Sequence, residues 1–423
     1  MLSRSLRLSA VLAAALALAG CSQLFSEAPG DLIASGRQRA DPSDDVSPDV
    51  GELSADNTDF GVALYRQVAK PGENLFFSPL SITQAFAMVY AGARGNTEQQ
   101  MQQTLRFSLP QERLHPAMNA LDQTLHSRTV AQPGQANAPE LRMVNAIWGQ
   151  QGFAFEQPYL DTLAVHYGAG MRAVDFTRDP ESLRRQINAW VEDQTNSRIK
   201  DLLAEGQVNV ATRLMLVNAL YFKGLWAQPF DPELTKDRPF HLADGTTRSI
   251  PMMRQNRHVD TMRGDGFQAL ALPYKGGALR MLVVLPDAGR YGEVEARLSG
   301  GFLDTVRKGL KEESRMLLFP KFQLEQELDL TEVLPAMGMS DAFSDSAANF
   351  QGISQQEQLV IGAAQHKAFI GTTELGTEAA AATGIGIELV SAPPLLALDR
   401  PFLFFIEDRE TKAVLFLGRL MNP

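Results

Sequence analysis

The chain has 423 residues, 44% of them hydrophobic, and a formal net charge of −10 at pH 7. The charge is spread along the chain without a long basic run, which excludes a typical nucleic-acid-binding protein, so we expect no nucleic-acid partner. Cys21 is the only cysteine, and this excludes an intramolecular disulfide.

Residues 1–20 predict a signal peptide of the lipoprotein type. Arg4 and Arg7 precede an apolar run of the length that signal peptides have. The run ends in Leu18-Ala19-Gly20-Cys21, which resembles a bacterial lipobox, where the peptidase cuts before the cysteine and the thiol is lipidated. The alternative is an ordinary secretory peptide with a chance cysteine. No later apolar run approaches the roughly 18–20 residues that cross a bilayer.

The residues after the cysteine predict an anchored protein held on a linker. Ser22 follows Cys21 where inner-membrane lipoproteins have aspartate, and by resemblance to Gram-negative lipoproteins this favours the outer membrane, on its periplasmic or its surface face. Residues 21–50 mix Pro, Gly, Ser and Asp with little apolar periodicity, and we expect them to be a flexible tether. About 29 flexible residues would reach roughly 30 Å.

The remaining residues, 51–423, contain no second linker and no repeat, and we expect one large domain. Apolar residues recur every four positions within 53–70 and predict an amphipathic helix. Another helix is expected to begin near Ser81, and after a glycine break a further one is capped by Asn96 or Thr97. Residues 187–203 also predict an amphipathic helix.

Strands are predicted where short apolar runs are rich in branched and aromatic side chains. These runs are 74–77, 214–224, 279–286, 401–408 and 413–420. The last two flank a polar turn and predict a hairpin. Helices gather in the first half of the domain and strands in the second, which indicates an α+β fold with largely antiparallel sheets.

Motifs of enzyme chemistry are weak in this chain. Ser197 and Lys200 have the S-x-x-K spacing, but no KTG or SDN partner follows, and we interpret them as an exposed helical turn. Residues 168–173 resemble a dinucleotide loop only in spelling, because no strongly apolar strand precedes them. The six histidines have no ligand spacing, so we expect no metal and no cofactor, and an exported hydrolase is the weakest hypothesis.

Residues 376–402 are rich in small and apolar side chains and allow more than one interpretation. Thr377 to Thr383 could form a short helix, but seven residues are too few to be stable alone. Considered as a strand, Thr377, Ala379, Ala381 and Thr383 would share one face that carries no charge and no side chain larger than threonine. Such a segment could enter a packed sheet. An ordinary linker is the other alternative.

Five segments, in order, resemble the signature segments of the serpin family, and the resemblance covers nearly all of residues 52–423. They are Asn74–Ile82, Leu216–Trp226, Asp237–Met253, His366–Thr383 and Arg400–Pro423. The resemblance implies the α+β serpin fold, with about eight or nine helices around three β-sheets and an exposed reactive-centre loop at about 374–398. It also implies a monomeric protease inhibitor rather than an enzyme. Such an inhibitor is cut by the protease in that loop and traps the protease as the loop inserts into the main sheet.

The resemblance assigns roles to particular residues. Trp226 matches the aromatic residue of the breach, where insertion begins. Leu375 departs from the family, which usually has a charged residue there. The polar cluster of the shutter, beneath the opening sheet, is matched by Ser78, Ser81, Asn218 and His366, and the hinge of inhibitory members is matched by Glu374, Gly376, Thr377, Glu378, Ala379, Ala380, Ala381 and Ala382.

The spacing from Gly376 to Pro401 resembles that of inhibitory members and implies a scissile bond between Val390 and Ser391, to within one or two residues. A valine before the cut suits an elastase-like protease, with subtilisin-like and cysteine proteases as further targets. Residues 376–399 contain no Lys or Arg, which disfavours trypsin-like targets. The rival hypothesis is a serpin-fold binding protein that does not inhibit.

Overall fold

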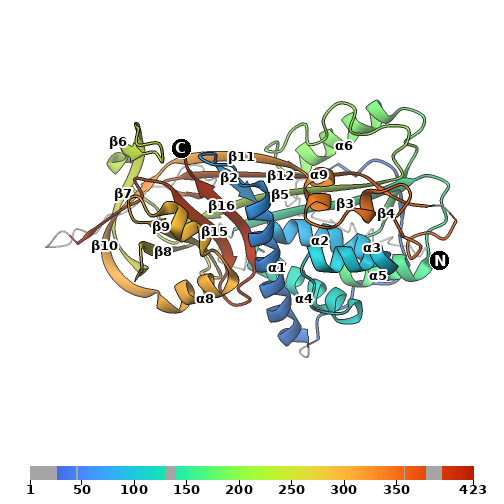
Figure 1. Ribbon diagram of the computed structural model, residues 1–423, viewed down its shortest axis with the longest axis horizontal. Coiled ribbons are helices and arrows are strands. Elements are labelled where there is room, and N and C mark those ends of the chain that lie inside the picture. The colour runs from blue at the N-terminus through green and yellow to red at the C-terminus, as the bar shows by residue number, and fades with distance from the viewer. Residues whose placement is uncertain (1–25, 44–45, 130–138, 357, 378–392) are drawn as a thin grey trace, which may run out of the picture.

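The computed structural model describes residues 26–43, 46–129, 139–356, 358–377 and 393–423 (Figure 1). Within these ranges it contains nine α-helices. They are α1 (Ser47–Val68), α2 (Pro79–Tyr90), α3 (Gly95–Thr104), α4 (Gln111–Thr129), α5 (Gln157–Tyr167), α6 (Pro180–Gln194), α7 (Tyr291–Ala296), α8 (Gly300–Gly309) and α9 (Leu330–Ala336). No helix in the described ranges has the length and apolar character that crossing a membrane requires.

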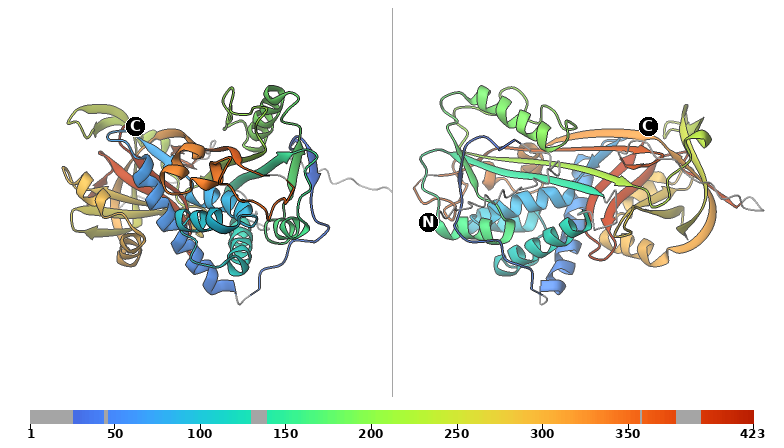
Figure 2. Two further views of the ribbon diagram at one scale, coloured as in Figure 1. Left: turned by 45° about the vertical axis from the view of Figure 1, so that its right-hand side comes forward. Right: turned by 180° about the vertical axis from the view of Figure 1, so that it is seen from behind.

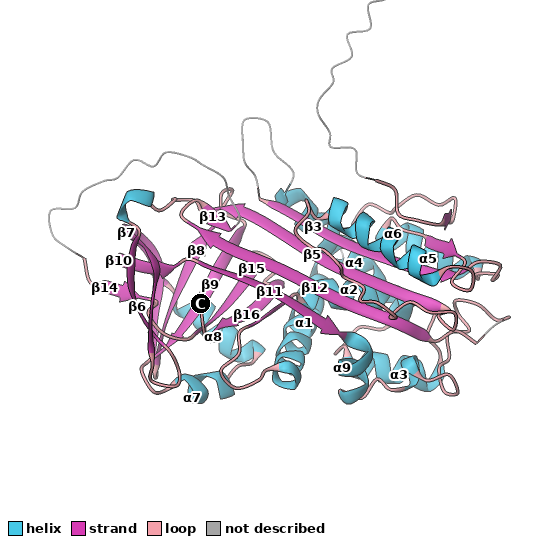
Figure 3. Cartoon of the chain, turned by 90° about the horizontal axis from the view of Figure 1, so that it is seen from above, coloured by secondary structure: helices cyan, strands magenta, loops and turns pink. Residues whose placement is uncertain are grey.

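Within the described residues, the main sheet has seven strands (Figure 3). In spatial order they are β1 (Asp31–Ile33), β4 (Met171–Val174), β3 (Glu140–Gln150), β5 (Leu214–Leu225), β13 (Gly376–Thr377), β12 (Ile361–Thr373) and β11 (Phe322–Asp329). Below the short β13, the strands β5 and β12 pair with each other directly and in parallel.

A second network of nine strands forms the other end of the molecule. It comprises β14 (Leu395–Ala397), β10 (Lys311–Pro320), β7 (Thr247–Gly264), β8 (Phe267–Pro273), β9 (Leu279–Pro286), β15 (Phe402–Asp408), β16 (Val414–Leu420) and β2 (Leu75–Phe77), with β6 (Lys236–His241) paired to β7. The expected three sheets therefore appear as two hydrogen-bonded networks. The reason is that β7 is 18 residues long and pairs with β6 and β10 along most of its length but with β8 at its end.

Helices cover both faces of the main sheet (Figure 2). Alternate residues of β5 divide between two cores, as the period of a strand requires. Met215 and Val217 pack with α6 on one face, and Leu214 and Leu216 belong to the larger core, which includes α2, α4 and α5, on the other.

The predicted helices and strands are largely confirmed, but the backbone geometry makes some of them begin or end at other residues than predicted. The strands and the C-terminal hairpin lie where the apolar runs predict them. Helix α3 begins at Gly95, with Arg94 rather than Asn96 or Thr97 at its cap. The prediction of a helix over 187–203 is wrong beyond Gln194, because Asn196 and Ser197 have positive φ angles of 51° and 59°. The S-x-x-K segment is therefore not a helical turn.

The prediction of a flexible tether over 21–50 is also wrong for the residues that the structure describes. Helix α1 begins at Ser47, and residues 26–43 lie against the domain, with β1 forming the outermost strand of the main sheet. The backbone N–H of Ala40 donates to the carbonyl of Val165 at 2.9 Å. The segment shows little apolar periodicity because a short β-ladder and polar contacts, rather than an apolar face, hold it on the domain.

Candidate functional site

The main sheet divides where β13 enters it, and we call this place the fork. Gly376 pairs with Thr373 of β12 on one side and with Leu225 of β5 on the other. Thr377 pairs with Thr372 and with Gly224 in the same way. Below the fork, Ile361–Phe369 and Leu214–Tyr221 pair in parallel. The first residues of the predicted hinge therefore already lie between the two strands that insertion would separate.

Glycine at position 376 is required by close approach of the backbone. A Cβ on Gly376 would lie 2.1 Å from the carbonyl oxygen of Gly224 and 2.6 Å from the Cα of Leu225. Both are backbone atoms of the paired strand and cannot turn aside, and the φ angle of Gly376 is 154°. The small hinge residue thus allows the chain to reverse from β12 into the fork.

Thr377 is anchored in an aromatic cluster at the head of the fork. Its side chain is fully buried, and its hydroxyl shares a hydrogen bond of 2.7 Å with the hydroxyl of Tyr274. The Tyr274 ring stacks on Trp226 at 4.8 Å and 11° and meets Phe222 edge-on. Burial raises the pKa of Tyr274, which keeps its hydroxyl protonated.

Trp226 lies where the breach residue is predicted and supports the turn into the hinge. Its indole N–H donates to the carbonyl of Thr373 at 3.1 Å, and its backbone N–H donates to the carbonyl of Leu375 at 2.8 Å. Leu375 itself is buried, so the apolar residue that departs from the family pattern faces the protein interior here.

Glu374 fixes the start of the turn. Its carboxylate accepts hydrogen bonds from the Nζ of Lys321 at 2.9 Å and from the hydroxyl of Thr235 at 2.8 Å. Burial by itself raises the pKa of this carboxyl, but the bonds from Lys321 and Thr235 outweigh it, and the pKa lies below its ordinary value. Glu374 is thus an ionised anchor between β12 and β11.

The four predicted shutter residues come together beneath β5 and β12. All are buried, and they connect the two strands to the N-terminus of α2. The backbone N–H of Ser78 donates to Nε2 of His366 at 3.1 Å. Asn218 donates to the carbonyl of Ser81 at 2.7 Å, and its Oδ1 contacts Nδ1 of His366. This last bond crosses the junction between β5 and β12.

The hydrogen bonds determine the protonation of His366. Since Nε2 accepts from Ser78, the proton lies on Nδ1, which donates to Asn218. Burial lowers the pKa of His366 to about 3, so the ring is neutral near pH 7. A neutral side chain can exchange partners within the sheet without burying a charge.

Several further residues contribute to this site that the sequence did not predict. Asn145 of β3 accepts a hydrogen bond from Asn218, and a polar residue within an apolar strand was a signal for it. Tyr274, Lys321 and Thr235 carried no local signal, because they meet the hinge only in the folded chain. Glu378, Ala379–Ala382, Val390, Ser391 and Cys21 lie outside the described residues.

This fold, with a loop strand that begins inside its main sheet, defines a known class of protein. The family model described as Serpin (serine protease inhibitor) matches residues 55–423, and the chain belongs to this family. An uncharacterized serpin-like protein of Thermococcus kodakarensis is 39% identical over 369 residues, 86% of this chain and 84% of that protein. The leukocyte elastase inhibitor of Bos taurus is 38% identical over 389 residues, 88% of this chain and 100% of that protein.

Solved structures agree with the assignment of the fold. Uncleaved ovalbumin superposes with a TM-score of 0.79 at 30% identity, covering 88% of this chain and 100% of that one. Human thyroxine-binding globulin superposes with a TM-score of 0.78 at 30% identity, covering 88% of this chain and 99% of that one. Because one of these similar structures is named as a thyroxine-binding protein, the fold does not by itself define inhibition.

Proposed function

We propose that this serpin is a suicide-substrate inhibitor of serine proteases, with elastase-like enzymes as its targets. The observation that carries the proposal is the position of Gly376 and Thr377 at the head of the fork. They are the first residues of a strand that can lengthen between β5 and β12. The residues that follow in sequence are small up to Thr383, apart from Glu378.

The proposed reaction begins as an ordinary proteolysis. The serine oxygen of the protease attacks the carbonyl carbon of Val390, and the bond to the nitrogen of Ser391 breaks. That nitrogen takes a proton and leaves as a new N-terminus, while Val390 stays joined to the protease as an ester. Water would normally hydrolyse the ester. Insertion of the loop before hydrolysis carries the protease along the sheet and stops the reaction at the ester.

The register of the fork specifies where each inserted residue would lie. Gly376 opposes Leu225 and Thr373, and Thr377 opposes Gly224 and Thr372. Continuing both antiparallel registers one residue at a time brings Thr383 opposite Asn218 on one side and His366 on the other. The hydroxyl of Thr383 would then lie between the two shutter side chains whose mutual bond insertion breaks, and it can both donate and accept.

The length of the two strands agrees with the implied cleavage site. In the same registers, Ile387 would oppose Leu214, the first residue of β5, and Glu388 would oppose Ile361, the first residue of β12. Residues beyond 388 would have no strand to pair with. Val390 follows directly, so a protease attached there would lie beyond the far end of the sheet rather than within it.

Insertion replaces one ladder with two. The parallel pairing of β5 with β12 is lost, and two antiparallel ladders form, which are slightly more stable per residue. Each new hydrogen bond contributes about 0.5–1.5 kcal/mol, whereas ordering each loop residue costs roughly 1–2 kcal/mol. The loop alone therefore does not supply the free energy that drives insertion, which has to come from the rearrangement of the whole main sheet.

An elastase-like target is supported by the chemistry of the loop. A valine before the cut fits a small apolar pocket, and residues 376–399 contain no Lys or Arg for a trypsin-like pocket. The similar protein from Bos taurus is named for its inhibition of leukocyte elastase.

The proposal is tested by mixing the protein with elastase, and in parallel with trypsin, a subtilisin and a papain-like protease. We expect an SDS-stable complex with elastase and release of a C-terminal peptide that starts at Ser391, and no complex with trypsin. Cleavage by elastase without a complex would contradict inhibition and would favour a binding role for this serpin fold.

We also propose that Cys21 is lipidated and anchors the protein to the outer membrane. Only residues 22–25 separate Cys21 from Ser26, the first described residue of the segment that lies on the domain. At about 3.3–3.6 Å per residue, the link spans at most about 18 Å, which is shorter than the expected tether. Labelling with radioactive palmitate should mark the wild-type protein and not Cys21→Ala; equal labelling of both would contradict the anchor.

A further inference from the structure

Residues 26–43 cross the outer edge of the main sheet, and we call this segment the strap. It precedes residue 55, where the match to the family begins, so it is an addition of this chain to the matched domain. Its strand β1 pairs with β4 through Asp31, Leu32 and Ile33. The strap therefore lengthens the main sheet by one strand on the side of β4, away from the fork.

One end of the strap is attached to the layer of α6. The backbone N–H and the hydroxyl of Ser26 both donate to Asp193 at the end of that helix, at 2.5 and 2.7 Å. The indole of Trp148, on β3, donates to the carbonyl of Pro29 at 3.0 Å. Trp148 in turn meets Trp190 of α6 edge-on at 5.5 Å. This end thus belongs with α6 and the strands beneath it.

The other end is attached to α4 and α5, on the opposite face of the sheet. Arg39 donates from Nε to Asn119 at 2.7 Å and from Nη2 to Asp122 at 2.6 Å. The carbonyl of Ala40 accepts from Asn119 at 2.8 Å and from Gln123 at 2.9 Å. These contacts tie the strap to α4.

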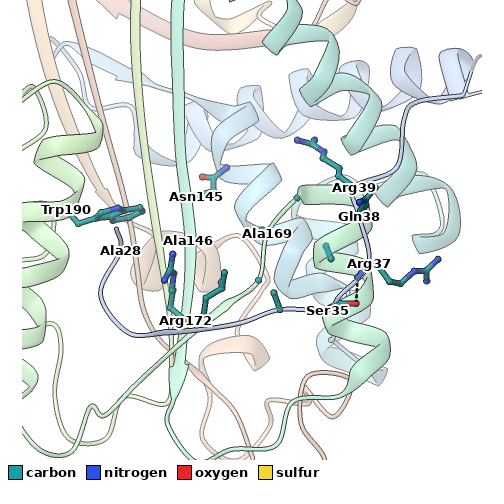
Figure 4. Close-up of a pocket in the computed structure, with 15 residues that line it drawn as sticks. Ala28, Ser35, Arg37, Gln38, Arg39, Asn145, Ala146, Ala169, Arg172 and Trp190 are labelled. Carbon is teal, nitrogen blue, oxygen red and sulfur yellow. Dashed lines mark hydrogen bonds between the residues drawn. The ribbon is translucent and has the colours of Figure 1, made fainter. Parts of the chain in front are cut away.

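Between its two ends the strap bridges a gap. A cleft of about 520 Å³ lies between the strap, Ala146 of β3, Arg172 of β4 with the preceding Ala169, and Trp190 of α6 (Figure 4). Little apolar packing supports this middle part, so the attachments at the ends and the β1 ladder hold it. Gly170 allows the strap to pass close to β4, because a Cβ there would lie 2.7 Å from the carbonyl oxygen of Ile33.

We propose that the strap restrains widening of the main sheet. A strand inserted at the fork separates β5 from β12 by one more strand spacing, about 4.8 Å. The half-sheet β1–β4–β3–β5 carries α6 with it. Helix α4 touches β3 but packs mainly against α1, and α1 packs against β16 of the second network. The strap is attached to both bodies. Because hydrogen bonds weaken steeply beyond about 3.5 Å, a displacement of this size breaks the contacts of Arg39 and Ala40.

The consequence for inhibition rests on the proposed insertion of the loop, but the restraint itself can be measured without a protease. Hydrogen exchange of the intact chain reports opening of β5 and β12, at residues 214–221 and 361–369. Arg39→Ala removes the two side-chain hydrogen bonds that join the strap to α4. Gly170→Ala adds a Cβ that would displace the strap from β4. Arg37→Ala is the matched control, since this side chain is 63% exposed and its nearest carboxylate, Asp161, is 3.7 Å away.

We expect Arg39→Ala and Gly170→Ala to accelerate exchange at both central segments about tenfold, which corresponds to about 1.4 kcal/mol, and Arg37→Ala to leave it unchanged. The opposite change is expected from a disulfide between Leu32→Cys and Arg172→Cys, in a chain that also carries Cys21→Ser. Leu32 and Arg172 are directly paired in the ladder of β1 and β4. Paired residues of antiparallel strands lie about 4.5–5.5 Å apart, within the range of a disulfide. The oxidised pair should slow central exchange, and reduction should restore it.

Two results would overturn the proposal. One is rapid exchange of residues 26–43 in the wild-type protein. The other is faster exchange of the strap in the variants with no change at β5 and β12, which would make the strap a passive attachment. If the variants accelerate central exchange and no protease is trapped, the restraint is supported and the proposed inhibition is contradicted.

Discussion

Tyr274 and Thr377 share a buried hydrogen bond of 2.7 Å although 103 positions separate them in the chain. Tyr274 follows β8 of the second network, and Thr377 is the last described residue before the loop of the proposed cleavage. The bond therefore joins the second network to the first residues of the strand that would lengthen during insertion.

Gly376→Ala is expected to expel the hinge from the fork. The added Cβ would meet the carbonyl oxygen of Gly224 at 2.1 Å, and a backbone atom cannot move aside cheaply. We expect a loss of several kcal/mol in the free energy of unfolding, or release of β13 with faster exchange at residues 376–377. Gly371→Ala is the control, because its Cβ would make only ordinary contacts at 3.8 Å. Equal effects of the two substitutions would contradict the fork geometry.

Thr377→Arg should separate cleavage from trapping. The site of Thr377 is fully buried, and an arginine there would require an unpaired charge in the sheet core. We expect the protease to cut this variant at the normal bond but to escape, with the number of inhibitor molecules used per protease raised at least about tenfold. Thr377→Ser, which retains the hydroxyl, should trap normally. Normal trapping by the arginine variant on denaturing gels would show that the register is wrong.

Thr383→Val tests whether residue 383 comes to lie at the shutter when the loop inserts. If the register of Gly376 and Thr377 continues during insertion, residue 383 would oppose Asn218 and His366, and valine has the shape of threonine without the hydroxyl. We expect the cleaved form to lose about 0.5–1.5 kcal/mol of stability, the contribution of a hydrogen bond, while the native form is unchanged. Melting of both forms, with Thr383→Ser as control, measures this. Equal losses in native and cleaved protein would place the hydroxyl elsewhere.

The pH dependence of native stability should include His366 and His115. Burial lowers the pKa of each to about 3, with a contribution from His166 at His115. Between about pH 6.5 and pH 3 the unfolded histidine binds a proton that the folded one does not, so stability falls as the pH is lowered through this window. One such group contributes a slope of up to about 1.4 kcal/mol per pH unit.

Denaturant titrations at pH 4 to 7 would measure this slope. His366→Gln and His115→Gln should each flatten the profile, whatever their effect on stability at pH 7. An unchanged slope in both buried-site variants would contradict their neutral state in the fold.

The confirmed elements were predictable because they depend on local periodicity. The run of branched, aromatic and other apolar residues at 214–224 predicts a buried strand, and the structure confirms it as β5. The end of α6 was not predictable from the same signal, because residues 195–203 continue the helical spacing of apolar side chains. Positive φ angles at Asn196 and Ser197 end the helix, and Leu202 and Leu203 are buried by the packing of the turn rather than by a helical face.

The candidate site divides in the same way. Gly376 was marked by the small side chains that follow it, and Asn218 by the resemblance to the shutter of the family. Tyr274 and Lys321 could not be identified in this way, because each lies on another strand or turn and is brought to the hinge only by the two sheets packing together.

By itself the sequence determined the resemblance to the family, strand β5 of the main sheet, strands β2, β9, β15 and β16 of the second network and the small side chains of the loop, since these follow from short-range order along the chain. Only the tertiary structure decided that Gly376 and Thr377 already lie between β5 and β12, and that residues 26–43 form a strap rather than a tether. Both outcomes depend on hydrogen bonds between residues distant in the chain, and the energy of such bonds belongs to the assembled sheet rather than to any segment of it.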